Sequence, residues 1–445
     1  MLKFVCYNDI GEKWEFFIDA TKKYFEEKIK THFPEFYEEI EGIAAGCCAG
    51  GTPTTTSEIL TWNNYFTMLD SWYSAYLSNN HPDGRESNKR EGGGVSDHCS
   101  AFIAVGDYTE DGKIVVAHNS FSNFIDGQYM SIILDLTPSK GHRIIMQTCP
   151  CWIWSGTDFF VTSAGIVGTE TTIGGFNAYE NNDPIAFRIR KAMQYGNTMD
   201  DYVKILLHEN SGDYANSWLF GDTNTNEILR LELGLKYHNV ERTKNGYFIG
   251  FNAAYDPRIR NKECTDSGFD DIRRHQGARR VRLGDLMDEN KGKLNINLAL
   301  KLIGDHYDVY LEKENPSSRT VCGHYELDAR EYMSDPSRPK PYQPRGALDG
   351  TAADTNLVKK MSFMARWGSS CGIPFNAAEF CNKRRQWAYL KPYLHDRPGQ
   401  PWTLFAITHR YNKKTKTIRR RHYNIKEKGP KTISKRIKNK MIKIK

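Results

Sequence analysis

The chain of 445 residues lacks the usual marks of membrane and secreted proteins. No run of about 18 apolar residues occurs, so the sequence predicts no membrane-spanning helix. The opening MLKFVCYNDIGEKWEFF has too short an apolar stretch for a signal peptide, and charges interrupt it. No Asn-x-Ser/Thr glycosylation acceptor is present, since proline disqualifies Asn315-Pro316-Ser317. We therefore expect an intracellular protein.

Familiar metal-binding and disulfide patterns are also missing. The ten cysteines include no C-x2-C pair, and no H-x3-H spacing accompanies a cysteine pair. Cys149 and Cys151 are too close in sequence for an easy disulfide. We expect mostly reduced, buried thiols, and neither a metal nor an organic cofactor.

Charge is distributed unevenly along the chain. Residues 411–445 hold 15 Lys or Arg and one acid, a charge of +14, so residues 1–410 carry −7 against the overall +7. We expect this tail to be disordered and to contact polyanions or anionic membranes in a salt-dependent way. Its charged part has a single aromatic residue, Tyr423, which does not indicate base stacking.

Hydrophobic periodicity predicts helices, then hairpin strands, then helices again. The expected helices cover 12–43, 56–77, 183–196, 198–210, 272–287 and 295–305, with Thr56 or Ser57 capping the second. The expected strands cover 99–106, 113–119, 129–136, 142–149 and 159–168, with further hairpins in 217–234 and 235–252, whereas 334–356 is read as irregular. This order favours an α+β fold of antiparallel sheets covered by helices.

Cys99 follows twenty residues, 78–97, that contain almost nothing apolar, and it opens an apolar strand. If the His98–Cys99 bond were cut, Cys99 would carry both a thiol and a free α-amino group. Such an amine has a pKa of about 7.7–8.0 and can serve as a built-in general base. The alternative is an ordinary buried strand cysteine, and the residues alone leave both interpretations open.

His118 ends the strand that pairs with the Cys99 strand. A hairpin that closes at Asp111-Gly112 brings both side chains to its open end, where His118 can assist a nucleophile. The alternative is a strand-end histidine that bonds to a loop.

A competing site lies at Gly368-Ser369-Ser370-Cys371-Gly372, which matches the G-x-S-x-G motif of α/β-hydrolases. Asp396 and His409 follow in the order that such enzymes require. However, Pro374 opposes the helix that must start at the serine, and no parallel strand–helix rhythm precedes it. The context therefore disfavours this site.

The stretch CSAFIAVGDYTEDGKIVVAHNSFSNF, which begins at Cys99, resembles the opening of the catalytic chain in phospholipase B-like proteins and penicillin-acyltransferase-type enzymes. Both are N-terminal-nucleophile (Ntn) hydrolases, which cleave themselves to expose the nucleophile. Four more blocks resemble this family in order, EEIEGIAAGCCAGGTPTTTSEILTWNNYF, CWIWSGTDFFVTSAGIVGTETTIGGFN, GYFIGFNAAYDPRIR with IRRHQGARRVRL, and the segment from Trp367 to Trp402. The resemblance implies a four-layer αββα sandwich and autocatalytic cleavage between His98 and Cys99.

The resemblance also implies roles for single residues. Cys99 is the expected nucleophile, His118 the active-site histidine and Asn252 a donor to the oxyanion, worth a few kcal/mol. Arg274 or Arg279 is expected near the active site. The substrate-binding candidates are Thr169, Thr171 and Asn119. The alternative for each of these residues is an ordinary structural role in a turn, a strand or a solvent-exposed helix.

The implied organisation has three parts: a helical pro-segment over 1–98, a catalytic chain over 99–410, and the basic tail. The apolar helices within 12–77 are expected to keep the two self-cleaved fragments together. The expected activity is hydrolysis of an amide or ester acyl bond in a lipid or small N-acyl substrate, through a Cys99 acyl-thioester. Acyl transfer, or an inactive protein that binds through its tail, are the alternatives, and the sequence predicts no oligomeric state.

Overall fold

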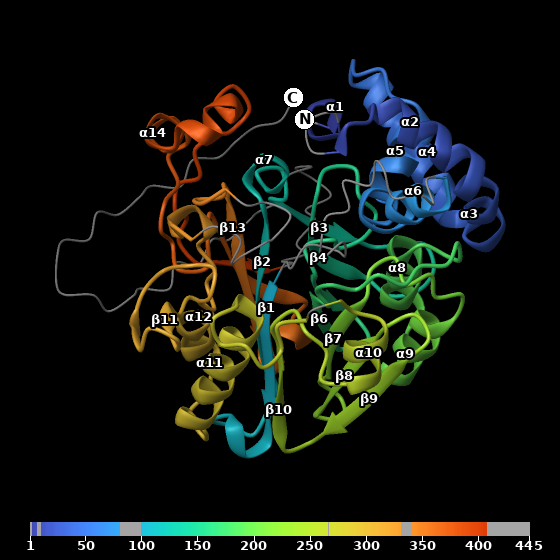
Figure 1. Cartoon of the computed structure of the whole chain (residues 1–445). Coiled ribbons are helices and arrows are strands. Elements are labelled where there is room, and N and C mark those ends of the chain that lie inside the picture. The colour runs from blue at the N-terminus through green and yellow to red at the C-terminus, as the bar shows by residue number, and fades with distance from the viewer. Residues whose placement is uncertain (1, 7–9, 81–98, 266, 331–339, 407–445) are drawn as a thin grey trace, which may run out of the picture.

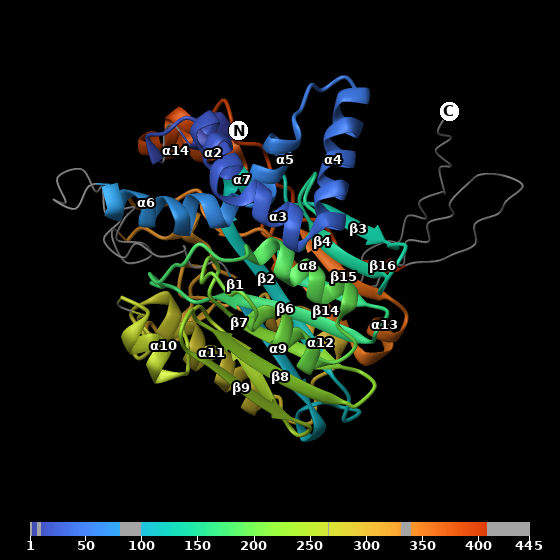
Figure 2. The ribbon, with the colours of Figure 1, turned by 90° about the vertical axis from the view of Figure 1, so that its right-hand side faces the viewer.

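The computed structural model describes residues 2–6, 10–80, 99–265, 267–330 and 340–406. Two antiparallel sheets lie face to face, with helices on both outer sides (Figures 1 and 2). His98, which precedes the predicted cleavage point, and the basic tail from residue 411 both lie outside the described residues. No described helix has the combined length and apolarity needed to cross a membrane.

The first sheet has seven strands and contains Cys99. Its strands, in spatial order, are β10 (Gly246–Gly250), β1 (Cys99–Val105), β2 (Val115–Asn123), β14 (Asp349–Asp354), β15 (Ser362–Trp367) and β16 (Thr403–Ala406), with β13 (Arg345–Ala347) also paired to β2. All of these pairs are antiparallel. β1 therefore lies inside the sheet, between β10 and β2, and its backbone is hydrogen-bonded on both edges.

The second sheet also has seven strands, joined in chain order. They are β3 (Ile132–Leu136), β4 (Ile144–Thr148), β5 (Phe159–Thr162), β6 (Ile166–Thr172), β7 (Asn216–Asp222), β8 (Glu227–Leu233) and β9 (His238–Thr243). A small separate ribbon pairs β11 (Tyr307–Asp308) with β12 (Lys313–Glu314).

Alternation along β1 shows how the layers stack, because successive side chains of a strand point to opposite faces. Ala101 and Ile103 join Val167 and Leu219 of the second sheet in one buried cluster. Phe102 points the other way, into a cluster with the outer helices α11 (His275–Glu289) and α12 (Ile296–Leu302). The first sheet therefore lies between the outer helices α11 and α12 on one side and the second sheet on the other.

The fourth layer covers the outer face of the second sheet. It contains α8 (Ile185–Tyr195) and α9 (Met199–Leu207), whose apolar faces pack with Phe160 and Phe220. α9 begins at a capping box in which Thr198 and Asp201 exchange hydrogen bonds. The architecture is the predicted αββα sandwich of the α+β class.

The N-terminal helices pack on this fourth layer (Figure 2). They are α1 (Leu2–Val5), α2 (Trp14–Thr21), α3 (Glu27–His32), α4 (Pro34–Ala49), α5 (Thr56–Asn63) and α6 (Tyr73–Asn80), with wider helical turns at 22–26 and 67–72. Phe33 contacts Phe187 of α8, with ring centroids 5.5 Å apart, and Thr67 donates to buried Asp213. These residues share one large hydrophobic core with the second sheet.

The remaining helices are short: α7 (Phe124–Gly127), α10 (Pro257–Lys262), α13 (Thr355–Lys359) and α14 (Ala377–Lys383). α7 extends β2 at one end of the first sheet, and α14 follows the loop after β15 (Figure 1).

Several details of the predicted secondary structure are wrong. The strand predicted over 113–119 continues to Asn123, so His118 lies within β2 and not at its end. The expected strand over 159–168 is two strands, since a turn at Ser163–Gly165 separates β5 from β6. Thr55, rather than Thr56 or Ser57, caps α5, because its side chain and that of Glu58 form the capping box. The region 334–356, predicted irregular, contributes β13, which pairs with β2, and β14, whose small residues fit between β2 and β15.

Candidate functional site

Cys99 is the first residue of β1, and its side chain is fully buried. The β1–β2 register places Cys99 opposite Ser120 and Ala101 opposite His118. Cys99 and His118 therefore share the face that points toward the second sheet. Ligand-type atoms of Cys99, His118 and Asp158 all lie within 4.8 Å of one another, so the hairpin brings the predicted pair together.

Two side chains hold the backbone of Cys99. Its N–H donates to Oδ1 of Asn252 over 3.2 Å, and its carbonyl oxygen accepts a hydrogen bond from Nη1 of Arg279. Nη2 of Arg279 also donates to Oδ1 of Asn252 over 2.8 Å. A guanidinium only donates, so this contact fixes which end of the Asn252 amide faces Cys99.

The other end of Asn252 is used as well. Its Nδ2 donates to the carbonyl oxygen of Thr172 over 2.7 Å. Asn252 has a φ of +68° and Asp158 a φ of +62°, both in the left-handed region that costs most residues energy. Asn and Asp adopt it more readily, and strained positions of this kind cluster at functional sites. Two residues that contact Cys99 thus share an uncommon backbone conformation.

The structure distinguishes the two candidate arginines. Arg279, on α11, is fully buried and donates to Cys99, to Asn252 and, over 3.2 Å, to Oγ of Ser100. Its Nε donates to the carbonyl oxygen of His275, one turn earlier. Arg274 is the half-buried N-cap residue of α11. Arg279 is therefore the arginine that contacts the candidate nucleophile.

Acidic side chains surround the thiol. Oδ2 of Asp158 lies 3.9 Å from Sγ of Cys99 and accepts a hydrogen bond from the Tyr214 hydroxyl over 3.3 Å. Glu170 of β6 is buried beside Asp158. Asp349 of β14 accepts hydrogen bonds from the Ser120 backbone N–H and, over 2.7 Å, from the Gln147 side chain.

Burial sets the ionisation of these acids. It raises the pKa of Asp158 to about 6 and that of Asp349 to about 7. Burial raises the pKa of Glu170 well above its ordinary value, and the charge of Asp158 raises it further. Asp158 therefore loses its proton at a lower pH than Glu170 does.

The same environment keeps Cys99 a thiol. Burial raises its pKa well above the ordinary value, and the charges of Glu170, Asp158 and Asp349 add to the effect. Burial lowers the pKa of His118 to about 3, so its imidazole is neutral. The site thus holds a neutral thiol beside a neutral histidine, and nucleophilic attack by Cys99 would require a proton acceptor.

The three predicted substrate-binding residues fall on different faces. Thr169 and Thr171 flank Glu170 on β6, and their buried hydroxyls have no hydrogen-bond partner among the described residues. Asn119 points away from the Cys99 side chain, because its neighbour His118 points toward it. Its Oδ1 accepts from the Ser100 N–H, and its Nδ2 lies 3.0 Å from Oγ of Ser370. Asn119 therefore organises the backbone on the far side of the sheet from the thiol.

The competing G-x-S-x-G site does not have the geometry of a nucleophile elbow. Ser370 is buried and donates to the carbonyl oxygen of Ile303 over 2.8 Å, and no helix begins before Ala377 in this region. Asp396 accepts a hydrogen bond from the Ala377 N–H. His409, the third expected member, lies outside the described residues.

Sequence reasoning missed the acids around Cys99. Glu170 interrupts the strand Ile166–Thr172, which is buried throughout, and a lone acid within such a strand is a recognisable signal. Asp158 stands just before a strand and carries no comparable local pattern. It reaches the thiol only through the packing of the two sheets.

Two groups of described side chains are close enough to hold a metal ion. One is Cys99 with His118 and Asp158; the other consists of His306, Cys322, His324 and Cys371. The first group contains the candidate nucleophile Cys99, which opens β1 and whose backbone atoms are held on both sides. The second group lies apart from it and is considered below.

Known proteins resemble this chain in sequence and in structure. A family model described as Phospholipase B matches residues 6–230, about half of the chain. A phospholipase B-like 2 protein of Bos taurus is 29% identical over 147 residues, 28% of this chain and 24% of that protein. A phospholipase B-like 1 protein of Caenorhabditis elegans is 22% identical over 377 residues, 76% of this chain and 63% of that protein.

Among solved structures, penicillin V acylase from Agrobacterium tumefaciens has a TM-score of 0.36 and 12% identity, covering 60% of this chain and 83% of the acylase. The matches span less than two thirds of the bovine and nematode relatives. The family model nevertheless covers the helices that precede Cys99, the β1–β2 hairpin and the second sheet as far as β8. This chain belongs to the phospholipase B family.

Proposed function

We propose that the protein is a cysteine hydrolase that activates itself by cleavage before Cys99 and then hydrolyses an amide or ester acyl bond. The observation that carries the proposal is the position of Cys99. It opens a central strand, its N–H and C=O are bound by Asn252 and Arg279, and its thiol lies beside Asp158. A cysteine that served only as packing requires no such set of polar partners.

The cleavage step makes and breaks bonds in a fixed order. Sγ of Cys99 attacks the carbonyl carbon of His98, the C–N bond between them breaks, and the nitrogen takes up the thiol proton. The product is a thioester, which water hydrolyses to a carboxylate on His98 and a free thiol on Cys99. The new α-amino group remains next to Oδ1 of Asn252, which already accepts a hydrogen bond from this nitrogen.

The new α-amino group then accepts the proton of the buried Cys99 thiol. Burial and the neighbouring acids oppose formation of a free thiolate at Cys99. An amine with a pKa of about 7.7–8.0 on the same residue takes the proton as Sγ attacks the substrate carbonyl, and returns it to the leaving group. Water hydrolyses the resulting acyl-thioester and regenerates the thiol.

Asn252 and His118 are the proposed stabilising groups. Nδ2 of Asn252 carries two N–H bonds, and one of them is used by Thr172. The second is the candidate donor to the oxyanion. His118 is the nearest neutral base to the thiol besides the α-amino group, and Asp158 stabilises the ammonium form of that group by its charge.

The phospholipase B family suggests an acyl ester of a lipid as the substrate, and an N-acyl amide uses the same chemistry. Transfer of the acyl group to a small nucleophile in place of water is the alternative outcome on the same residues. Panels of phospholipids and N-acyl amides, with released acyl chains measured by mass spectrometry, test both classes. Release that requires Cys99 supports the proposal.

The matched control for this assay is Cys149→Ala. Cys149 is also buried, and like Cys99 it has a pKa that burial and the charges of nearby acids, Asp158 among them, raise. Activity that is lost in Cys99→Ala and kept in Cys149→Ala assigns the chemistry to the first residue of β1. Equal loss in both variants would contradict that assignment.

We propose a separate role for the basic tail, residues 411–445, in contact with polyanions or anionic membranes. Its charge of +14 supports this role. Deleting it should remove salt-sensitive binding to anionic vesicles while leaving acyl hydrolysis of a soluble substrate intact. Loss of soluble-substrate hydrolysis on deletion would instead make the tail part of the catalytic unit.

A further inference from the structure

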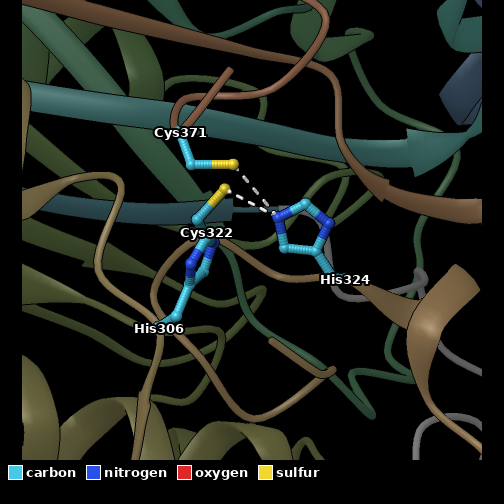
Figure 3. Close-up of side chains that lie close together, drawn as sticks. All are labelled: His306, Cys322, His324 and Cys371. Carbon is cyan, nitrogen blue, oxygen red and sulfur yellow. Dashed lines mark hydrogen bonds between the residues drawn. The ribbon is translucent and has the colours of Figure 1, made fainter. Parts of the chain in front are cut away.

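Four potential metal ligands meet on the side of the first sheet away from the Cys99 thiol. His306 follows α12, Cys322 and His324 precede β13, and Cys371 follows β15 (Figure 3). One nitrogen or sulfur atom of each lies within 4.8 Å of those of the other three. Three segments that are distant in sequence therefore converge on one point with two thiols and two imidazoles.

The spacing of these atoms fits a tetrahedral ion. Nε2 of His324 lies 3.4 Å from Sγ of Cys322 and 3.3 Å from Sγ of Cys371. Around tetrahedral zinc, with Zn–S near 2.3 Å and Zn–N near 2.0–2.1 Å, a sulfur and a nitrogen ligand are about 3.6 Å apart. The rings of His306 and His324 are nearly perpendicular, with centroids 5.0 Å apart, so both can present a nitrogen to the same point.

The surroundings supply the contacts that usually support metal ligands. Nδ1 of His324 is 2.7 Å from Oε1 of Glu326, so its Nε2 is free to face the thiols. A carboxylate on the far nitrogen of a ligand histidine orients the ring and strengthens its basicity. The Ile373 backbone N–H and the Ser369 hydroxyl both lie 3.3 Å from Sγ of Cys371. Nε2 of His306 is buried and has no hydrogen-bond partner among the described residues.

We propose that His306, Cys322, His324 and Cys371 bind one Zn²⁺ ion as a structural site. A set of two thiolates and two imidazoles is typical of zinc, and four protein ligands leave no open position for a substrate. The site therefore stabilises structure and takes no part in acyl chemistry. This replaces the expectation of a protein without metal, which rested on C-x2-C and H-x3-H spacings that these residues do not follow.

The site is connected to the Cys99 strand through Asn119. Nδ2 of Asn119 donates to the carbonyl oxygens of Ile303 and Val321 and lies 3.0 Å from Oγ of Ser370. Each of these residues is within three positions of a proposed ligand. Oδ1 of Asn119 accepts from the N–H of Ser100, next to the nucleophile. A zinc ion that joins the three segments thus also fixes the Asn119 side chain, which is hydrogen-bonded to β1.

The test is metal content of the full-length protein, expressed in medium that contains zinc and measured by inductively coupled plasma mass spectrometry. We expect about one zinc per chain. Protein stripped with a chelator should regain zinc and should bind Co²⁺ with the visible and thiolate charge-transfer bands of tetrahedral coordination. These readouts do not depend on self-cleavage or on hydrolysis, so they can fail or succeed independently of the proposed function.

Variants assign the ligands. Cys371→Ser should lose the stoichiometric zinc. Cys381→Ser should keep it, because Cys381 is a buried cysteine whose thiol contacts the backbone carbonyl of Trp387 and none of the proposed ligands. Glu326→Gln retains all four ligands and should weaken zinc affinity by about 10–100-fold through the orientation of His324. Because this variant keeps every ligand, it tests the site even if Cys371→Ser folds poorly.

Three results would overturn the proposal. The first is purified protein that holds no zinc and gives no cobalt thiolate band after refilling. The second is a disulfide between Cys322 and Cys371 in freshly isolated protein, found by peptide mapping under non-reducing conditions. Zinc retained at full stoichiometry in Cys371→Ser would assign the ion to a different set of ligands and would equally contradict the site.

Discussion

Asp158 offers a quantitative test of the electrostatics around the nucleophile. Its Oδ2 lies 3.9 Å from Sγ of Cys99, and burial raises the pKa of Asp158 only to about 6. Asp158 is therefore already charged at any pH where Cys99 loses its proton. Replacing Asp158 by asparagine keeps the shape of the side chain and removes this charge.

The size of the effect follows from Coulomb's law. Two unit charges separated by 3.9 Å repel by about 4 kcal/mol at an effective dielectric constant of about 20. Asp158→Asn should therefore lower the pKa of Cys99, because it removes up to about 4 kcal/mol of repulsion between the carboxylate and the thiolate. The pKa should stay above its ordinary value, because burial and the charge of Glu170 are the larger causes of its elevation.

The assay is a pH titration of thiolate ultraviolet absorbance, recorded as the difference between each protein and the same protein with Cys99→Ala. The difference isolates Cys99 from the other nine cysteines and needs no access for a reagent. Asp135→Asn, which removes an exposed acid paired with Arg143, is the matched control and should leave the titration unchanged. An unchanged or higher Cys99 pKa in Asp158→Asn would refute the electrostatic account.

Three further predictions follow from the geometry. Arg279→Lys should slow self-cleavage by about 10–100-fold in a mass-spectrometric time course, because a single ammonium cannot bond both Cys99 and Asn252 as the guanidinium fork does; Arg274→Lys, the control, should cleave at the normal rate. Hydrolysis by the mature enzyme should fall as pH drops below about 8, where the α-amino group gains a proton and can no longer accept the thiol proton. It should fall further through about pH 6, where Asp158 gains a proton and no longer stabilises the ammonium, and Asp158→Asn should remove this second step. Burial raises the pKa of Asp349 to about 7, so its contribution to stability is present below about pH 4 and is lost as pH rises to about 7. Over that range the free energy of unfolding should fall by about 1.4 kcal/mol per pH unit on account of Asp349. Urea denaturation at several pH values should show that Asp349→Asn lacks this fall.

Local pattern was enough to predict the hairpin that carries the proposed nucleophile. β1 is an unbroken apolar run bounded by a polar segment and a glycine turn, and its register with β2 places Cys99 and His118 on one face. The contact between two strands of a hairpin depends on a short stretch of chain. The resemblance to Ntn hydrolases then pointed to Asn252 and to either Arg274 or Arg279, without stating which arginine or which atoms contact Cys99.

Features that depend on packing between distant segments were not predictable. β14 has the sequence DGTAAD, in which Thr351 is the single β-branched residue and no aromatic residue occurs. It is a strand because it fills the space between β2 and β15. Asp158 and Glu170 reach the thiol only after the two sheets stack. The proposed zinc ligands come from three segments, and only the spacing Cys322-x-His324 was visible locally.

The most direct test of the central claim is intact mass with N-terminal sequencing of the purified full-length protein, kept at neutral and mildly acidic pH. The account predicts two associated fragments, the second starting at Cys99, and a single uncut chain for Cys99→Ala. Cys99→Ser should cleave more slowly, because a hydroxyl can replace the thiol in the attack on the preceding carbonyl. A wild-type chain that stays whole, or one that is cut at a different bond, would contradict the claim that Cys99 is the nucleophile released by self-cleavage.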